Sequence, residues 1–160
     1  MRLILCCTMV LFSLTLSVQA AEKNSVPSYE DELLRLRLIP RTPEQMAAFY
    51  EARGFPAAMI SELTQLCFYT VIIKNKSSSL VWLDLSQWQF IAGTQEIRRI
   101  PRSYWPPKWN AMHIPLAAQS TFRWTLLPEQ LDFQPDETEG GNIILDRTDG
   151  SFSLLAKFGF

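Results

Sequence analysis

The side chains best suited to catalysis or metal binding are scarce in this sequence. His113 is the only histidine among the 160 residues, and the cysteines are Cys6, Cys7 and Cys67. A blue-copper site takes two histidines and a cysteine, and most catalytic zinc sites take two or three histidines. Sites of these kinds are excluded. Cys6 and Cys7 lie in the first twenty residues, which are expected to be removed, so zinc or iron–sulfur sites built from several cysteines are excluded in the mature chain as well.

A copper(I) site is one chemistry that remains open. Soft copper(I) accepts thioether and imidazole ligands, and the candidates are Met46, Met59, Met112 and His113, with Cys67 as a further one. Met112 and His113 are neighbours in the chain, which suits a shared site. The competing interpretation, which we favour, is that Met46 and Met59 fill gaps in the core as flexible apolar side chains.

A small hydrolase that uses His113 as its base is the other chemistry that remains open. The histidine would have to activate Cys67, a serine or an acid. Cys67 opens an apolar strand, however, where a cysteine is usually an inert core residue. Neither a Gly-x-Ser-x-Gly elbow nor a glycine-rich phosphate or dinucleotide motif is present in the sequence. We therefore expect a non-enzymatic protein with no catalytic residue and no cofactor.

Residues 98–109 have the composition of a recognition surface. Three prolines, which would stiffen the segment, are interleaved with arginine, tyrosine and tryptophan, the types that dominate binding hot spots. The candidate contact residues are Arg99, Arg102, Tyr104, Trp105 and Trp109. An envelope protein, an anionic glycan or a lipid headgroup would suit them. The competing interpretation is a structural crossover, whose tryptophans plug the end of the domain and whose arginines pair with the acidic segment 128–141.

Charge narrows the set of partners. The formal net charge is -1, so the chain has no overall basic excess of the kind that nucleic-acid-binding domains carry. We expect no nucleic-acid partner. The acidic segment has hard oxygen ligands that could bind calcium, but its spacing matches no EF-hand loop. A solvated loop is the simpler interpretation.

The first twenty residues have the pattern of a secretory signal peptide. Arg2 precedes an apolar run that begins at Leu3, and Val18 and Ala20 place small residues before a cut ahead of Ala21. A retained membrane anchor is the alternative, because the apolar stretch approaches spanning length. No second apolar segment of that length follows, so we expect no transmembrane segment in the mature chain. Export to the bacterial periplasm suits a mature chain with one cysteine and thus no internal disulfide.

The rest of the chain predicts a mainly β domain. We expect a flexible lead-in over 21–29 and then a single domain over 30–160, with about seven or eight short strands. The strands are expected near 34–38, 67–73, 80–83, 87–92, 96–100, 120–126, 142–146 and 151–158, the last two as a hairpin. Thr42, Pro43 and Gln45 form a strong helix start, and Gly54 and Pro56 separate two helices within 43–66. Segment 101–115 is expected to be irregular.

This pattern favours an antiparallel β-sandwich of immunoglobulin-like architecture with an inserted α-helical hairpin at 43–66. A fold of this kind does not determine function. The sequence therefore predicts an exported, non-enzymatic binding or assembly module of the bacterial cell envelope that uses the Pro/Trp/Arg-rich segment for recognition.

Overall fold

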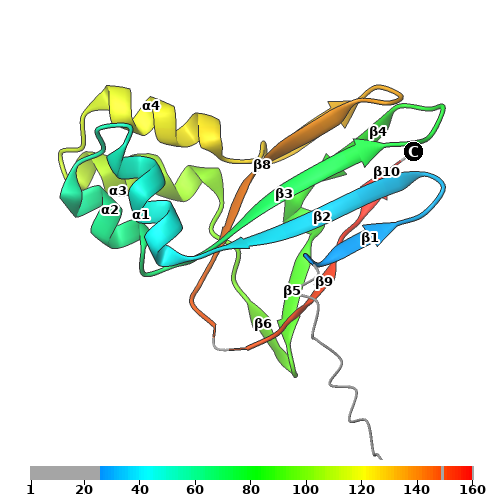
Figure 1. Ribbon diagram of the computed structural model, residues 1–160, viewed down its shortest axis with the longest axis horizontal. Coiled ribbons are helices and arrows are strands. Elements are labelled where there is room, and N and C mark those ends of the chain that lie inside the picture. The colour runs from blue at the N-terminus through cyan, green and yellow to red at the C-terminus, as the bar shows by residue number, and fades with distance from the viewer. Residues whose placement is uncertain (1–25, 149, 160) are drawn as a thin grey trace, which may run out of the picture.

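The computed structural model describes residues 26–148 and 150–159. The predicted signal peptide, residues 1–20, and the first part of the predicted lead-in lie outside the described residues. Within them, strand is more abundant than helix, and the strands form several antiparallel sheets, none of which is closed (Figure 1). The prediction of a mainly β fold is confirmed.

The largest sheet has four strands in the order β1-β2-β3-β8. They are β1 (Ser28–Glu30), β2 (Leu34–Arg41), β3 (Cys67–Asn75) and β8 (Thr138–Leu145). β2 follows the predicted alternation: Leu34, Leu36 and Leu38 are buried, and the arginines between them are exposed. The lead-in prediction is wrong at its end, because residues 28–30 pair with β2 as a strand.

Two further sheets have three strands each. One is β10-β4-β7, made of β4 (Val81–Asp84), β7 (Gln130–Phe133) and β10 (Phe158–Gly159); the other is β6-β5-β9, made of β5 (Gln89–Ala92), β6 (Gln95–Ile97) and β9 (Ser153–Leu155). The predicted hairpin of 142–146 with 151–158 is therefore wrong. β8 pairs with β3, and β9 pairs with β5. The acidic segment is not a simple loop either, since it contains β7 and the start of β8.

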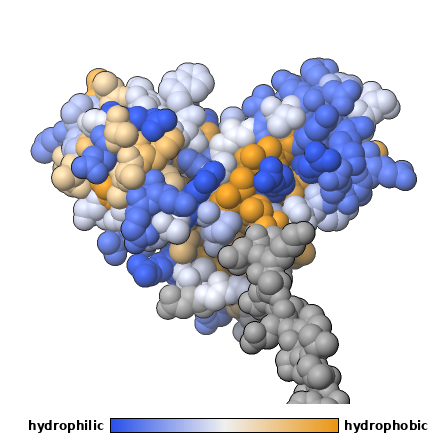
Figure 2. Space-filling model, in the orientation of Figure 1, coloured by the Kyte–Doolittle hydropathy of each residue, from blue (hydrophilic) through white to orange (hydrophobic). Residues whose placement is uncertain are grey.

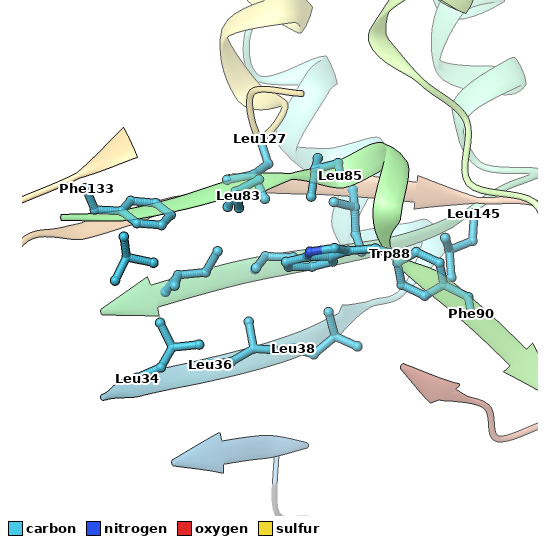
Figure 3. Packing of buried hydrophobic residues seen from close by; sticks show 14 of the residues in the cluster. Leu34, Leu36, Leu38, Leu83, Leu85, Trp88, Phe90, Leu127, Phe133 and Leu145 are labelled. Carbon is cyan, nitrogen blue, oxygen red and sulfur yellow. The ribbon is translucent and has the colours of Figure 1, made fainter. Parts of the chain in front are cut away.

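A hydrophobic core joins the four-stranded sheet to the two smaller sheets. The leucines of β2 point toward Leu83 of β4, Phe133 of β7 and Trp88, which directly precedes β5 (Figure 3). Burial of large apolar side chains is the main stabilising contribution here, at about 1.5–3 kcal/mol for each. The side chains on one face of β2, β3 and β8 thus belong to this core, and the side chains on the opposite face do not.

Two helices lie between β2 and β3 in the chain, α1 (Pro43–Glu51) and α2 (Ala57–Leu63). The predicted capping box is present, because Thr42 Oγ1 accepts the amide of Gln45 and the Gln45 side chain accepts the amide of Thr42. Gly54, with φ of 70°, allows the backbone to turn between the helices.

The segment between β6 and β7 is helical, contrary to two predictions. Segment 101–115 contains α3 (Trp105–Ala111), and segment 120–126 belongs to α4 (Leu116–Thr125) instead of a strand. Pro106 and Pro107 fall in the first turn of α3, where a missing amide costs no helical hydrogen bond. In α4, Phe122 is buried and Ala118 is half-buried, and they lie on one helical face.

The four helices pack around one end of the four-stranded sheet (Figure 1). Their own core includes Tyr50, Met59 and Trp109, and it reaches the sheet through Phe68 of β3 and Ile144 of β8. Among residues 26–148 and 150–159, no helix has the length and apolar content needed to cross a membrane.

Candidate functional site

The tryptophans of the predicted recognition segment are buried. Trp105 and Trp109 are 2% and 1% exposed. Their rings stack with centroids 5.0 Å apart, and both pack edge-on against Phe122. The apolar surface of these two residues is used within the helical core, which agrees with the interpretation of the segment as a plug.

The arginines of the same segment hold the structure together. Arg99 makes a two-pronged ion pair with Glu129, with nitrogen–oxygen distances of 2.6 and 3.1 Å. Glu129 also accepts the backbone amide of Arg102 at 2.6 Å, and the Arg102 guanidinium donates to the carbonyl of Leu126. Burial lowers the pKa of Arg102, and the nearby Arg123 cation lowers it further. The competing interpretation of the sequence, a plug whose arginines pair with the acidic segment, agrees with these contacts.

Tyr104 is the one member of the predicted set that stays at the surface. It is 39% exposed, and the Lys108 ammonium lies 5.9 Å from the centre of its ring. Lys108 itself is held by Glu62 at 2.5 Å. Tyr104 alone does not make a contact surface.

The candidate copper ligands lie in different environments. Met46 and Met59 are buried in the helical core, and Met112 packs against it. His113 is exposed in the turn between α3 and α4. Within residues 26–148 and 150–159, no group of three or more His, Cys, Asp or Glu side chains is arranged to hold a metal ion. The copper(I) alternative stays a prediction, and burial of the two methionines agrees with the core-filling interpretation.

The residues of the hydrolase alternative are not joined. Cys67 opens β3 and packs half-buried against the core between the sheets. Among the side-chain hydrogen bonds of residues 26–148 and 150–159, none links Cys67 to His113 or involves the imidazole of His113.

A different surface gathers exposed charge, and sequence reasoning did not single it out. We call it the outer face: the side of the four-stranded sheet that points away from the core between the sheets. On β2, the residues that alternate with the buried leucines place their side chains there. The strand register adds residues of β3 and β8. The face is made of Arg35, Arg37, Ile39 and Arg41 of β2, Thr70, Ile72 and Lys74 of β3, and Gly140 and Asn142 of β8.

Positive charge dominates the outer face. Glu30 of β1 pairs with Arg35 through two hydrogen bonds of 2.6 and 2.8 Å and with Lys76 at 2.8 Å. The hydrogen bonds from Arg35 and then Lys76 lower the pKa of Glu30 to about 2. Lys74 lies 3.4 Å from Asp136. Arg37 is exposed and forms no ion pair within the described part of the chain, so the face has unneutralised positive charge.

A chain of hydrogen bonds fixes the end of the outer face nearest the helices. Arg41 Nε donates to Thr70 Oγ1 at 2.9 Å, and the Thr70 hydroxyl donates to Asn142 Oδ1 at 2.8 Å. On the side of the helices, the hydroxyls of Tyr50 in α1 and Thr125 in α4 lie 2.9 Å apart. Burial raises the pKa of Tyr50 to about 12. This end of the face is therefore rigid and uncharged apart from the Arg41 guanidinium.

The centre of the outer face is apolar. Ile39 and Ile72 are half-buried diagonal neighbours on β2 and β3. Gly140 lies directly beside Ile72 and has no side chain to cover it. Figure 2 shows hydrophobic residues over the middle of the sheet, in a hollow between the helices and the far end of β2 and β3, with hydrophilic residues on both sides.

Two other surface features are weaker candidates. An open depression of about 390 Å³ is lined by Leu85, Ser86, Trp88, Glu96, Arg98 and Arg99. Its arginines already pair with Asp146 and Glu129. On α4, Trp124 is 87% exposed and Leu116 is 75% exposed. Nothing in the described residues covers this helical stripe.

Comparison with known proteins adds no assignment. The chain matches no protein-family model, no curated protein and no solved structure.

A sequence signal for the outer face exists at β2. The alternation of leucine and arginine over 34–38 puts arginines on the face opposite the leucines. By itself, this alternation predicts a strand and does not indicate a binding surface. The contribution of Ile72 and Asn142 depends on which strands flank β2 and β3, and this information is not local.

Proposed function

We propose that this protein is an exported, non-enzymatic binding module of the bacterial cell envelope, and that the outer face is its contact surface for an anionic partner. One observation carries the proposal. Four cationic side chains lie around an apolar centre on a sheet face that is open to solvent, and two carboxylates, Glu30 and Asp136, pair with two of them, in a chain whose formal net charge is -1. This face thus carries more positive than negative charge, whereas the whole chain does not.

The residue types on the outer face suit phosphate or carboxylate ligands. A guanidinium presents a planar set of donors that matches both groups. Arg37 is exposed with no acidic partner in the described residues, and Arg41 is already oriented by Thr70. A side chain that is fixed before binding loses less freedom when the ligand arrives. These two arginines are the proposed primary contacts.

The apolar centre supports an amphipathic partner over a simple ion. Ile39 and Ile72 offer apolar surface between the cations, and covering it would add to the binding free energy. An anionic glycan or a lipid headgroup would combine both kinds of group. Contact through the segment 98–109 is not part of this proposal.

Export to the periplasm is supported by the pattern of residues 1–20 and by the single cysteine that would remain after cleavage. Cell fractionation with mass spectrometry of the amino terminus tests it. We expect a periplasmic protein that starts at Ala21. A protein that keeps residues 1–20 and stays in the membrane fraction would support the anchor alternative.

The proposal includes an immunoglobulin-like β-sandwich with an inserted helical hairpin at 43–66. Its support is the apolar core shared by the four-stranded sheet and the two smaller sheets, and the position of α1 and α2 between β2 and β3. Such a scaffold would hold the outer face rigid while its opposite face forms the core.

Binding to anionic ligands tests the function. We would measure cosedimentation with phosphatidylglycerol and phosphatidylcholine vesicles, and affinity for soluble polygalacturonate by calorimetry. The variant is Arg37→Gln/Arg41→Gln, and the control is Arg98→Gln/Lys157→Gln, which removes the same charge from outside the outer face. We expect salt-sensitive binding to an anionic ligand that only the first variant loses. Equal loss in both variants, or no binding to any anionic ligand, would overturn the proposal.

A further inference from the structure

We infer that the outer face is a two-anion site, shaped for the headgroup of a membrane lipid that carries two phosphates on a disaccharide. This inference depends on the proposed function and names the ligand class of the same surface. It follows from the spacing of Arg37 and Arg41, from what lies between them, and from how both ends of the face are closed.

The spacing follows from the strand. Arg37 and Arg41 are on the same face of β2, with Ile39 between them on that face. A strand rises roughly 3.3 Å per residue, so the two Cα atoms are about 13 Å apart. A ligand with two anionic groups on a spacer of sugar size matches this separation of the two Cα atoms, and it would place one anionic group at each guanidinium.

The two arginines are able to receive such groups. Arg37 is exposed and makes no ion pair within residues 26–148 and 150–159. Arg41 uses its Nε for Thr70, and no hydrogen bond from its two terminal nitrogens is found within those residues. Each guanidinium therefore has free donors, and that of Arg41 is held in position by the bond to Thr70.

The surface between the arginines fits a weakly polar spacer. Ile39 and Ile72 provide the apolar floor, and the lack of a side chain at Gly140 leaves room beside Ile72. Thr70 and Asn142 line the same area, and their side chains are already hydrogen-bonded to each other. A sugar ring has an apolar face and a polar rim, which suits a floor of this composition.

Both ends of the face limit the number of anions to two. Beyond Arg37, the Glu30 carboxylate forms ion pairs with Arg35 and Lys76, and its negative charge would repel a third anion. Directly opposite Arg41 on β3 lies Phe68, which is buried under the helices and closes that end of the face. A long polyanion, which would need a continuous track of cations, is therefore a poorer fit than a compact headgroup with two charges.

Calorimetry with matched headgroups tests the inference. The probes are the deacylated disaccharide bisphosphate of lipid A, the same disaccharide with one phosphate, and phosphatidylcholine vesicles with and without intact lipid A. We expect the bisphosphate to bind about tenfold more tightly than the monophosphate, since it adds a charged contact. Arg37→Gln should lower the affinity for the bisphosphate to about the level of the monophosphate, and Arg98→Gln should change neither.

The outcomes separate the inference from the proposed function. Equal affinity for both disaccharides would overturn the two-anion site while leaving an anion-binding outer face intact. Binding to the soluble bisphosphate but not to lipid A vesicles would overturn a membrane lipid as its source. If no anionic ligand of any kind binds, the proposed function fails with it. Because Arg37 has no ion pair in the described residues, circular dichroism should show Arg37→Gln to be folded.

Discussion

Arg41 on β2 donates a hydrogen bond of 2.9 Å from its Nε to Oγ1 of Thr70 on β3. The hydroxyl of Thr70 in turn donates a hydrogen bond to Oδ1 of Asn142 on β8. Three strands are thereby joined on the outer face by side chains as well as by their backbones. The positive charge of Arg41 is held at a fixed place on the sheet, and the proposed function depends on this arrangement.

Replacing Thr70 by valine removes the hydroxyl while keeping the β-branched shape. Arg41 loses its acceptor and Asn142 loses its donor in a half-buried position, so we expect a loss of about 1–2 kcal/mol in the free energy of unfolding. Urea denaturation measures it. Thr121→Val, at an exposed position of α4, is the matched control and should change little. An equally small effect at Thr70 would show that the hydrogen-bond chain contributes nothing to stability.

Glu129 connects Arg99 to the backbone of Arg102, and its removal should destabilise the fold. The Arg99 side chain is 12% exposed, so Glu129→Ala leaves a largely buried cation without its partner, at an expected cost of about 2–4 kcal/mol. Adding Arg99→Met should recover part of that cost, because no unpaired cation remains. Thermal melts of Glu129→Ala, of Arg99→Met, of the double variant and of the exposed control Glu32→Ala decide this. A double variant as unstable as the sum of its singles would contradict the account.

Trp105 should tolerate phenylalanine far better than alanine. Alanine removes a large side chain from the helical core, at about 3–5 kcal/mol. Among the described residues, the indole nitrogens of both Trp105 and Trp109 are buried without a hydrogen-bond partner. Phenylalanine keeps most of the packing and removes an unsatisfied donor, so we expect Trp105→Phe to cost about 1 kcal/mol. Chemical denaturation compares the stabilities of the two variants. If the alanine variant were nearly as stable as the wild type, Trp105 would not contribute to the helical core as described.

The attachment of β1 should depend on pH through Glu30. Its pKa is lowered from an ordinary value near 4.5 to about 2 by hydrogen bonds from Arg35 and Lys76. A lowered pKa means that the stabilisation is complete above about pH 4.5 and is lost as the pH falls toward 2. The difference in urea midpoint between the wild type and Glu30→Gln should therefore shrink over that range. A difference that is the same at pH 6 and pH 2.5 would show that the ion pairs do not stabilise β1.

Local signals predicted the first part of the fold well. Thr42, Pro43 and Gln45 specify a helix start with backbone partners only three residues away. The alternation around Leu36 specifies a strand with one buried face. Each of these features is decided by residues that are neighbours in the chain, so the sequence contains the required information.

The later part was less predictable for physical reasons. The aromatic and β-branched residues around Phe122 favour a strand, but burial of one side against the other helices makes the segment a helix. Pro106 and Pro107 are typical of a loop in the sequence, although the first turn of a helix also accepts proline. The partners of β8 and β9 lie many residues away in the chain, and no local pattern encodes them.

The emphasis of the sequence pattern on residues 98–109 has the same cause. Trp105 and Arg99 have the composition of a binding segment, but composition does not distinguish a hot spot from a core plug. Arg37 was visible in the alternating pattern of β2, whereas its neighbours Ile72 and Gly140 come together only through strand pairing. Long-range topology, more than residue type, decides which side chains share a surface.

The most direct test of the outer face is a nuclear magnetic resonance titration of the isotopically labelled protein with the disaccharide bisphosphate. Our account predicts that the amide signals of Arg37, Ile39, Thr70 and Ile72 shift with increasing ligand, while those of Arg99, Trp105 and Trp109 stay in place. Shifts confined to residues 98–109, or absent throughout at millimolar ligand, would contradict it.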